Sequence, residues 1–524
     1  MHHSLLSASM TRIFLSTFLL SFAVFPHLDA RSILIYGRGQ DAKKLDPADI
    51  TDGESVKVVS SIFDNLVTYA EDSAEIVPEL ATRWDVSKDG KTWTFHLRPN
   101  VKFHDGTPFN ADAVVFTMNR IINPKNSYRF GGAFGYAGSY KMIESVRASD
   151  ALKVDFKLKY ATVIFLPNMA MFPAGIVSPT AMKKFGKKSA MRPVGTGPFK
   201  FKSWSRQAKI VLVANQNYWA GKPGVDSVIF KPVRENSARS LQLEQGAIHM
   251  MDGIDFSDVA RLQKTKGVQV QVVPGMNFAY LAMNNTVKPF DNPKVRKAIA
   301  HAVDKPKIIK LAYHGFGRPG VNPLPPTIWG YHTGIQDYPV NIAKAKALLR
   351  EAGFPNGFKT KLWAMPNPRP YMPQPRKVAQ VIQQGLKAIG VEAEIVTYDW
   401  GQYLERTSKG EHPMCLLGWS TDNADPDNFL FELLDKTNAV KGSALNVSFY
   451  RSDPLHDLLT AAQREYDRAK RLSLYHRAQE LIHKDVPMVP LAYLPIVRAQ
   501  STRVKGYTVH PTGLIRLRKV SLSD

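Results

Sequence analysis

Residues 80–106 read LATRWDVSKDGKTWTFHLRPNVKFHDG. The pair Asp89-Gly90 is a strong signal for a two-residue turn between strands. After it, three apolar residues alternate with polar ones: Trp93, Phe95 and Leu97. Such alternation is typical of a strand with one buried face, so the stretch predicts a β-hairpin. A second turn at Asp105-Gly106 leads to Asn110, which we expect to cap a helix that runs to Ile122.

Downstream of this hairpin, helical and extended patterns alternate. Helical periodicity is present from Asn292, over 341–353, from Arg376 to Gly390 and over 454–484, and extended apolar stretches cover 391–398 and 486–499. A helix that ends at a glycine and is followed by a strand is typical of α/β proteins. We find no short-period repeat and no long low-complexity linker.

Length and composition narrow the class of protein. The chain has 524 residues, of which 44% are hydrophobic and 22% charged, so it is expected to form about two to four domains or two interleaved lobes. The formal net charge of +24 fits nucleic acid, an anionic surface or a basic habitat. The sequence has no RNA-binding aromatic signature or Cys/His finger, which favours a solvated basic surface over a nucleic-acid partner. The single Cys415 excludes an intramolecular disulfide and is expected to be a buried, inert thiol.

The N-terminus has the pattern of a secretory signal. Arg12 precedes the mostly apolar run 13–25, and the stretch Pro-His-Leu-Asp-Ala that ends at Ala30 fits the cleavage pattern of such signals. We therefore predict a signal peptide over 1–30, cleavage after Ala30 and a soluble mature protein, the alternative being a retained N-terminal anchor. The region has no cysteine for a lipid anchor, so release into a bacterial periplasm fits best. Removing residues 1–30 takes away one Arg and one Asp, so the basic charge belongs to the mature chain.

Residues 80–106 closely resemble the signature of the bacterial family 5 extracellular solute-binding proteins, which are receptors of peptide and nickel ABC importers. The likeness continues in Val194–Phe199, Asn217–Trp219, Pro274–Asn277, Trp363–Pro366 and Gly418-Trp419. It covers essentially the whole mature chain and is greatest for the dipeptide-binding members.

The resemblance implies an α/β fold of two lobes, the periplasmic binding protein type II fold (cluster C). It further implies an extra subdomain on lobe one and a two-strand hinge. Carried over to this chain, lobe one covers 31–276, lobe two covers 277–489, and residues 490–524 return to lobe one. The two crossings are expected at 274–284 and 487–499.

A free dipeptide is a zwitterion, and burying either charge costs several kcal/mol unless an opposite charge meets it. In the dipeptide-binding relatives, a carboxylate after the Gly-Trp motif binds the ammonium, and a guanidinium after a Met-Pro motif binds the carboxylate. The matching residues here are Asp422 and Arg369. The planar guanidinium suits a bidentate carboxylate contact. Trp419 and Tyr371 are candidate pocket walls, with a core role as the alternative.

Other polar residues near these motifs are expected to have structural roles. Asp425 and Asp427 are predicted to be turn and capping residues rather than ligands. Relatives with this motif often have a disulfide just downstream, but residues 435–450 contain no cysteine, which puts in doubt the pocket rim near Asn446. His104 belongs to a turn signature and is expected to be structural.

The sequence contains no phosphate-binding Gly-x-x-x-x-Gly-Lys-Ser/Thr motif, no His-Glu-x-x-His and no Gly-x-Ser-x-Gly. We therefore predict no catalytic residue, no metal site and no cofactor. The predicted function is a monomeric periplasmic receptor that captures dipeptides or short peptides and delivers them to an inner-membrane ABC permease. A receptor for haem, glutathione or nickel is the alternative within the family, and a secreted hydrolase is the alternative of another class.

Overall fold

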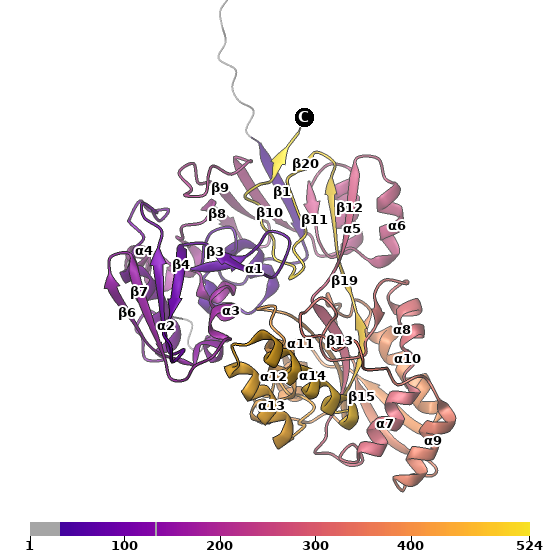
Figure 1. Ribbon diagram of the computed structural model, residues 1–524. Helices are drawn as coiled ribbons and strands as arrows, with labels where there is room; N and C mark the ends of the chain where they lie inside the picture. The colour runs from indigo at the N-terminus through magenta and orange to yellow at the C-terminus, as the bar shows by residue number, and fades with distance from the viewer. Residues whose placement is uncertain (1–31, 131–133, 524) are drawn as a thin grey trace, which may run out of the picture. The chain divides into compact units, whose positions relative to one another are not determined.

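The computed structural model describes residues 32–130 and 134–523. The predicted signal peptide at 1–30 lies outside the described residues. Figure 1 shows a mixture of helices and sheets in which strands far apart in the sequence are neighbours.

The largest sheet combines strands from both ends of the described chain. Its spatial order is β12 (Val268–Pro274), β19 (Pro495–Ser501), β11 (Met250–Met251), β1 (Ile33–Arg38), β10 (Ser227–Pro232), β9 (Lys209–Ala214) and β8 (Phe199–Ser205). The helices in the same portion of the chain are α1 (Gly53–Val59), α3 (Phe165–Met169), α4 (Pro179–Phe185), α5 (Asn236–Glu244) and α6 (Phe256–Lys264). Strand β1 pairs in parallel with β10 and β11, as α/β connections require.

A second sheet lies in the middle of the sequence. Its order is β14 (Arg318–Pro319), β18 (Met488–Tyr493), β13 (Asn277–Met283), β17 (Met414–Ser420), β15 (Phe358–Trp363) and β16 (Val391–Val396). Its helices are α7 (Pro293–Ala302), α8 (Lys305–Ala312), α9 (Ile342–Glu351), α10 (Pro375–Ala388), α11 (Trp400–Ser408) and α12 (Asp427–Leu434). Every residue of β13 is buried, because the strand is paired on both sides and covered on both faces.

The predicted hairpin forms a third sheet, the extra subdomain. Its order is β4 (Ala81–Val86), β5 (Thr92–Leu97), β7 (Lys153–Leu158) and β6 (Ile143–Asp150). Along β5 the three apolar residues are buried and their neighbours are partly exposed, as the alternation predicted. Helix α2 (Ala111–Ile122) begins where expected, since Asn110 accepts a hydrogen bond from the Ala113 N–H.

The chain crosses between the two larger sheets twice. Strand β12 ends at Pro274 in the first sheet, and β13 begins at Asn277 in the second. On the return, β18 ends at Tyr493 in the second sheet, and β19 begins at Pro495 in the first. The division into lobes at 276/277 and 489/490 stays a prediction, and the second change of sheet falls a few residues beyond 489.

The helical pattern at 454–484 forms two helices, α13 (Asp453–Arg464) and α14 (Arg468–Asp485). The break follows from a new N-cap, because the Asp467 side chain accepts hydrogen bonds from the Ala469 and Lys470 N–H groups.

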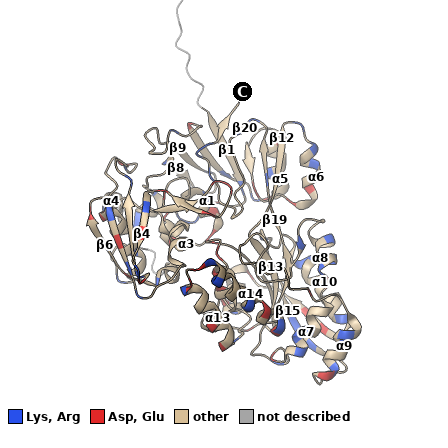
Figure 2. Cartoon of the chain, viewed as in Figure 1, with Lys and Arg blue, Asp and Glu red and all other residues tan. Residues whose placement is uncertain are grey.

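Lys and Arg residues are spread over α6, α8, α9 and α14, among other elements (Figure 2). In the part of the chain that the structure describes, no helix is both long and apolar enough to cross a membrane.

Candidate functional site

Two neighbouring parallel strands carry the predicted anchors. Strands β15 and β17 pair through Leu362 with Met414 and Trp363 with Cys415. Arg369 follows β15, and Asp422 follows β17. Because the carboxyl ends of parallel strands meet at one edge of a sheet, the two loops leave from the same edge, where α/β proteins bind their ligands.

The Arg369 guanidinium is fixed in position and has no acidic partner among the described residues. A tight turn fixes its backbone, since Arg369 N donates to Met372 O at 3.1 Å and Met372 N donates to Arg369 O at 2.9 Å. The guanidinium carbon lies 3.8 Å from the ring centroid of Trp400. Its Nε is buried without a hydrogen-bond partner, and no acid of the described residues forms an ion pair with it. Burial lowers the pKa of Arg369, yet a guanidinium stays charged at neutral pH.

Tyr371 joins the Arg369 loop to strand β17. A Cβ atom at Gly418 would lie 2.2 Å from Tyr371 Cδ2 and 2.5 Å from Cγ, so only glycine allows the ring to lie on the strand. Burial raises the pKa of Tyr371 to about 12, and the nearby Arg369 charge opposes that rise. Asp422 is four residues beyond Gly418, so at most about 14 Å of extended chain separates it from the residue that the Tyr371 ring contacts.

Asn428, on α12, positions the loop that carries Asp422. Its Oδ1 accepts hydrogen bonds from the Trp419 Nε1–H at 3.0 Å and from the Asp422 N–H at 2.9 Å. The Trp419 indole is therefore fixed on one side, and its ring is partly buried. Its predicted role as a pocket wall stays a prediction, as does that of Tyr371.

Among the described residues, the Asp422 carboxylate accepts a hydrogen bond from one hydroxyl group and has no cationic partner. Tyr136 donates to Oδ1 at 3.1 Å, and Tyr69 donates to the backbone carbonyl at 3.2 Å. No Lys, Arg or His of the described residues forms an ion pair with Asp422. Burial raises its pKa to about 6, while hydrogen bonds from Tyr136 and Asn428 act in the opposite direction.

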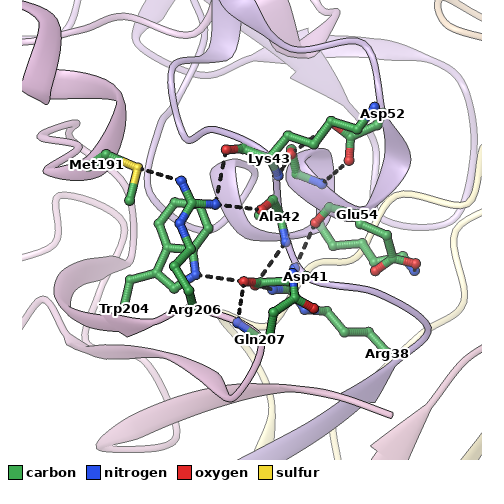
Figure 3. Close-up of polar contacts among 12 residues, drawn as sticks. Arg38, Asp41, Ala42, Lys43, Asp52, Glu54, Met191, Trp204, Arg206 and Gln207 are labelled. Carbon is green, nitrogen blue, oxygen red and sulfur yellow. Dashed lines mark hydrogen bonds and ion pairs between the residues drawn. The ribbon is translucent and has the colours of Figure 1, made fainter. Parts of the chain in front are cut away.

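The charged residues in the loop after β1 differ from Asp422 and Arg369, because they are paired within the protein. Arg38 and Asp41 form a buried ion pair at 2.8 Å. Asp41 also accepts hydrogen bonds from Trp204 Nε1 and the Gln207 N–H, as Figure 3 shows, and Arg206 lies over the Trp204 ring. These charges are neutralised within the protein, whereas Asp422 and Arg369 have no ion-pair partner among the described residues.

Residues 75–441 match the family described as bacterial extracellular solute-binding proteins, family 5. The chain belongs to this family. The Escherichia coli dipeptide-binding protein is 37% identical over 100% of both chains, and Heme-binding protein A of Haemophilus influenzae is 38% identical over 89% of this chain and 88% of the relative.

Solved structures of family 5 solute-binding proteins confirm the predicted two-lobed α/β fold. A periplasmic binding protein of Helicobacter pylori, solved in complex with the peptide STSA, is 40% identical. It has a TM-score of 0.84 and covers 94% of this chain and 99% of its own. A dipeptide-binding protein of Pseudoalteromonas in complex with Met-Leu has the same TM-score at 32% identity, covering 94% of this chain and 100% of its own.

The acidic residues after Asp422 have a larger structural role in this family 5 protein than the sequence indicated. Asp425 is a turn residue as predicted, since the Asp427 N–H donates to Asp425 Oδ1 at 3.0 Å, but the N-cap position of α12 is Pro426 and no side chain of the described residues caps this helix. Asp425 also forms a buried, bidentate ion pair with Arg471 at 2.8 and 2.7 Å, which ties the loop to α14. Burial raises the pKa of Asp427, whose side chain accepts a hydrogen bond from Gln463.

The other residues singled out are structural. Cys415 is fully buried, and burial raises the pKa of its thiol, as expected for an inert cysteine. His104 Nε2 lies 2.9 Å from Gly197 O, and burial lowers the pKa of this imidazole to about 4. Asn446 is fully buried and donates to the carbonyls of Asp435 and Tyr450, so hydrogen bonds hold this cysteine-free segment.

Sequence reasoning missed the residues that surround the anchors. Tyr69 and Tyr136 come from segments with no motif, so nothing in the sequence pointed to Asp422 as their partner. Asn428 directly follows Asp427 in the stretch Asp-Pro-Asp-Asn-Phe at 425–429, and its position at the start of a helix was the available signal. Within residues 32–130 and 134–523, no group of three or more His, Cys, Asp or Glu side chains is arranged to hold a metal ion.

Proposed function

We propose that this protein is a periplasmic receptor that binds dipeptides or short peptides by their charged ends. Asp422 takes the ammonium group and Arg369 the carboxylate. The receptor then delivers the unchanged ligand to an inner-membrane ABC permease. Export follows from the predicted signal peptide, and cleavage after Ala30 would leave Arg31 as the first residue of a monomeric mature chain.

The observation that carries the proposal is a pair of opposite, unneutralised charges at one edge of a sheet. Each is partly removed from water, which is unfavourable in the absence of a counter-charge. A zwitterion supplies both counter-charges at once. The guanidinium is already oriented by Trp400, so little freedom is lost when it binds a carboxylate.

The fixed position of the Arg369 loop would limit the length of the peptides that the site accepts. Because Tyr371 lies on Gly418, the loop is tied to the strand that leads to Asp422. An extended peptide advances about 3.3 to 3.6 Å per residue, so two anchors spaced for a dipeptide would disfavour longer chains. Side chains would then be accommodated loosely, because the binding energy lies in the termini.

Closure of two lobes around the ligand is the proposed signal to the permease. We propose lobe one as 31–276 with the return segment 490–524, and lobe two as 277–489, hinged at the two changes of sheet. Tyr69 and Tyr136 belong to the first of these segments and donate hydrogen bonds to Asp422 in the second. A ligand that contacts both lobes favours the closed form by its differential affinity.

The test is isothermal titration calorimetry with alanyl-alanine and two blocked analogues. N-acetylation removes the ammonium and C-terminal amidation removes the carboxylate, so each is expected to weaken binding at least tenfold. Equal affinity for the free and acetylated peptides would remove Asp422 from the proposed role. Mass spectrometry of the incubated peptide separates receptor from hydrolase, since a receptor returns it intact. Native mass spectrometry of co-purified ligand distinguishes peptide from haem or glutathione.

A further inference from the structure

Glu432 places a second carboxylate beside the proposed ammonium site. It lies on α12, four residues after Asn428, and residues at this spacing share one face of a helix. Asn428 accepts the hydrogen bond from the Asp422 N–H, so this face of α12 is directed toward the Asp422 loop. Phe431 and Leu433, on either side of Glu432 in the sequence, are buried in the core, whereas Glu432 is partly exposed.

Glu432 is close to Asp422 and has no partner of its own. Across the described ranges, its carboxylate takes part in no hydrogen bond or ion pair. Burial raises its pKa to about 7, and the neighbouring Asp422 charge contributes to the rise. The charge of Glu432 also raises the pKa of Tyr136, which donates to Asp422. Three residues are therefore neighbours: Asp422 in the loop after β17, Glu432 on α12, and Tyr136 in a distant segment of the chain.

Two neighbouring carboxylates repel each other, and each is costly to remove from water without a counter-charge. The ammonium of a neutral dipeptide neutralises one of them and leaves the other. Among the described residues, no cation forms an ion pair with Glu432. Lys141, whose charge lowers the pKa of Glu432, does not lie within ion-pair distance of it. A ligand with two positive charges at its amino end matches the pair.

We propose that Glu432 is a specificity determinant that selects peptides whose first residue carries a cationic side chain, such as lysine, ornithine or arginine. Asp422 binds the α-ammonium and Glu432 binds the side-chain cation. The proposal rests on the proposed function, because it requires Asp422 to hold the peptide amino terminus. The proposal adds a preference for peptides with a cationic first side chain, which the two terminal anchors alone do not select.

The test compares three dipeptides by calorimetry at pH 8: alanyl-alanine, lysyl-alanine and its isomer alanyl-lysine. The isomers have the same net charge, so only the position of the cation differs. Lysyl-alanine is expected to bind about tenfold more tightly than either of the others, which is the lower end of the range for a hydrogen bond to a charged group. In Glu432→Gln this preference should fall to about one. The matched control Glu394→Gln, on an exposed strand position, should keep the tenfold preference.

The pH dependence provides a second readout. Between pH 8 and pH 6 a carboxyl with a pKa of about 7 becomes mostly neutral, so the preference for lysyl-alanine should decline over this range. The other charged groups near Glu432 are Asp422, Asp435 and Lys141, and His456 on α13 is bonded to Asp435. The same pH titration of the Glu432→Gln variant measures the contribution of these other groups. In this variant, the ratio of the affinities for lysyl-alanine and alanyl-alanine should stay constant with pH.

Two results would overturn the inference while leaving the proposed function intact. One is equal affinity of the unaltered protein for lysyl-alanine and alanyl-alanine. The other is an equal loss of affinity for all three peptides in Glu432→Gln, which would make Glu432 a general closure contact. If none of the free dipeptides binds to the unaltered protein, the proposed function itself fails, and this inference fails with it.

Discussion

Replacing Asp422 with asparagine is expected to weaken peptide binding and to stabilise the ligand-free protein. The amide keeps the size of the side chain and an oxygen that can accept the Tyr136 hydroxyl. It removes the charge that the peptide ammonium needs. Removing one partner of a buried charge pair costs about 3 to 5 kcal/mol, and the lower value suits a side chain that is only partly buried. A loss of about 3 kcal/mol corresponds to a Kd roughly 150-fold higher.

The expected stability change has the opposite sign. Burial raises the pKa of Asp422 to about 6, from an ordinary value of about 3.9 in an unfolded chain. The folded state therefore binds the proton more tightly, and this contribution to stability is lost as the pH rises from about 4 to 6. At pH 7 the ionised carboxyl destabilises the ligand-free fold by roughly 3 kcal/mol, a cost that asparagine lacks. The midpoint of thermal unfolding should rise by a few degrees.

Calorimetry with alanyl-alanine measures the first effect, and scanning calorimetry of the ligand-free protein at pH 5 and pH 7 measures the second. Asp150→Asn, on an exposed position of β6, is the matched control and should change neither quantity. Unaltered peptide affinity in Asp422→Asn would refute the anchor. A joint fall of affinity and stability would refute the electrostatic reasoning, because it would mean that the variant had damaged the fold.

Three further substitutions test the supporting structure. Gly418→Ala places a Cβ within 2.2 Å of the Tyr371 ring, so the Arg369 loop must shift, and calorimetry should show a Kd about tenfold higher with unchanged circular dichroism. Arg369→Lys keeps the charge but loses the planar fork, and it should weaken alanyl-alanine about tenfold while leaving the amidated peptide unaffected. Arg471→Met leaves Asp425 buried without its cation, and urea titrations should show a free energy of unfolding lower by about 3 to 5 kcal/mol. The loss should be smaller in the double variant that also carries Asp425→Asn, because no unpaired charge then remains buried.

Local signals were sufficient for only part of the fold. The hairpin at β4 and β5 was predictable because its turn and its alternation lie within a few residues of each other. Helices α2 and α7 were predictable because Asn110 and Asn292 are N-caps whose bonds are local. The break between α13 and α14 was missed, since apolar periodicity continues through a segment in which Asp467 starts a new helix.

The site was predictable only as far as its motifs extend. Asp422 and Arg369 stand in stretches that resemble those of the family, so their residue types indicated a role. The hydroxyl groups of Tyr69 and Tyr136 reach Asp422 across 353 and 286 residues of sequence, and no local pattern encodes such contacts. The same holds for the pair of Asp425 and Arg471, since each is an ordinary charged residue until the fold brings them together.

The contacts around Asp422 explain why closure would depend on a ligand. Tyr136 and Tyr69, from the portion of the chain before β13, supply hydroxyl groups to the Asp422 loop but no positive charge. Without a ligand, bringing them together removes water from an anion that the protein leaves unneutralised, and the repulsion from Glu432 adds to this cost. Under the proposed function, an ammonium group would remove this cost when it occupies the site. The free energy of closure would therefore depend on the charge of the ligand, which is the property by which such a receptor would distinguish its bound form from its empty form.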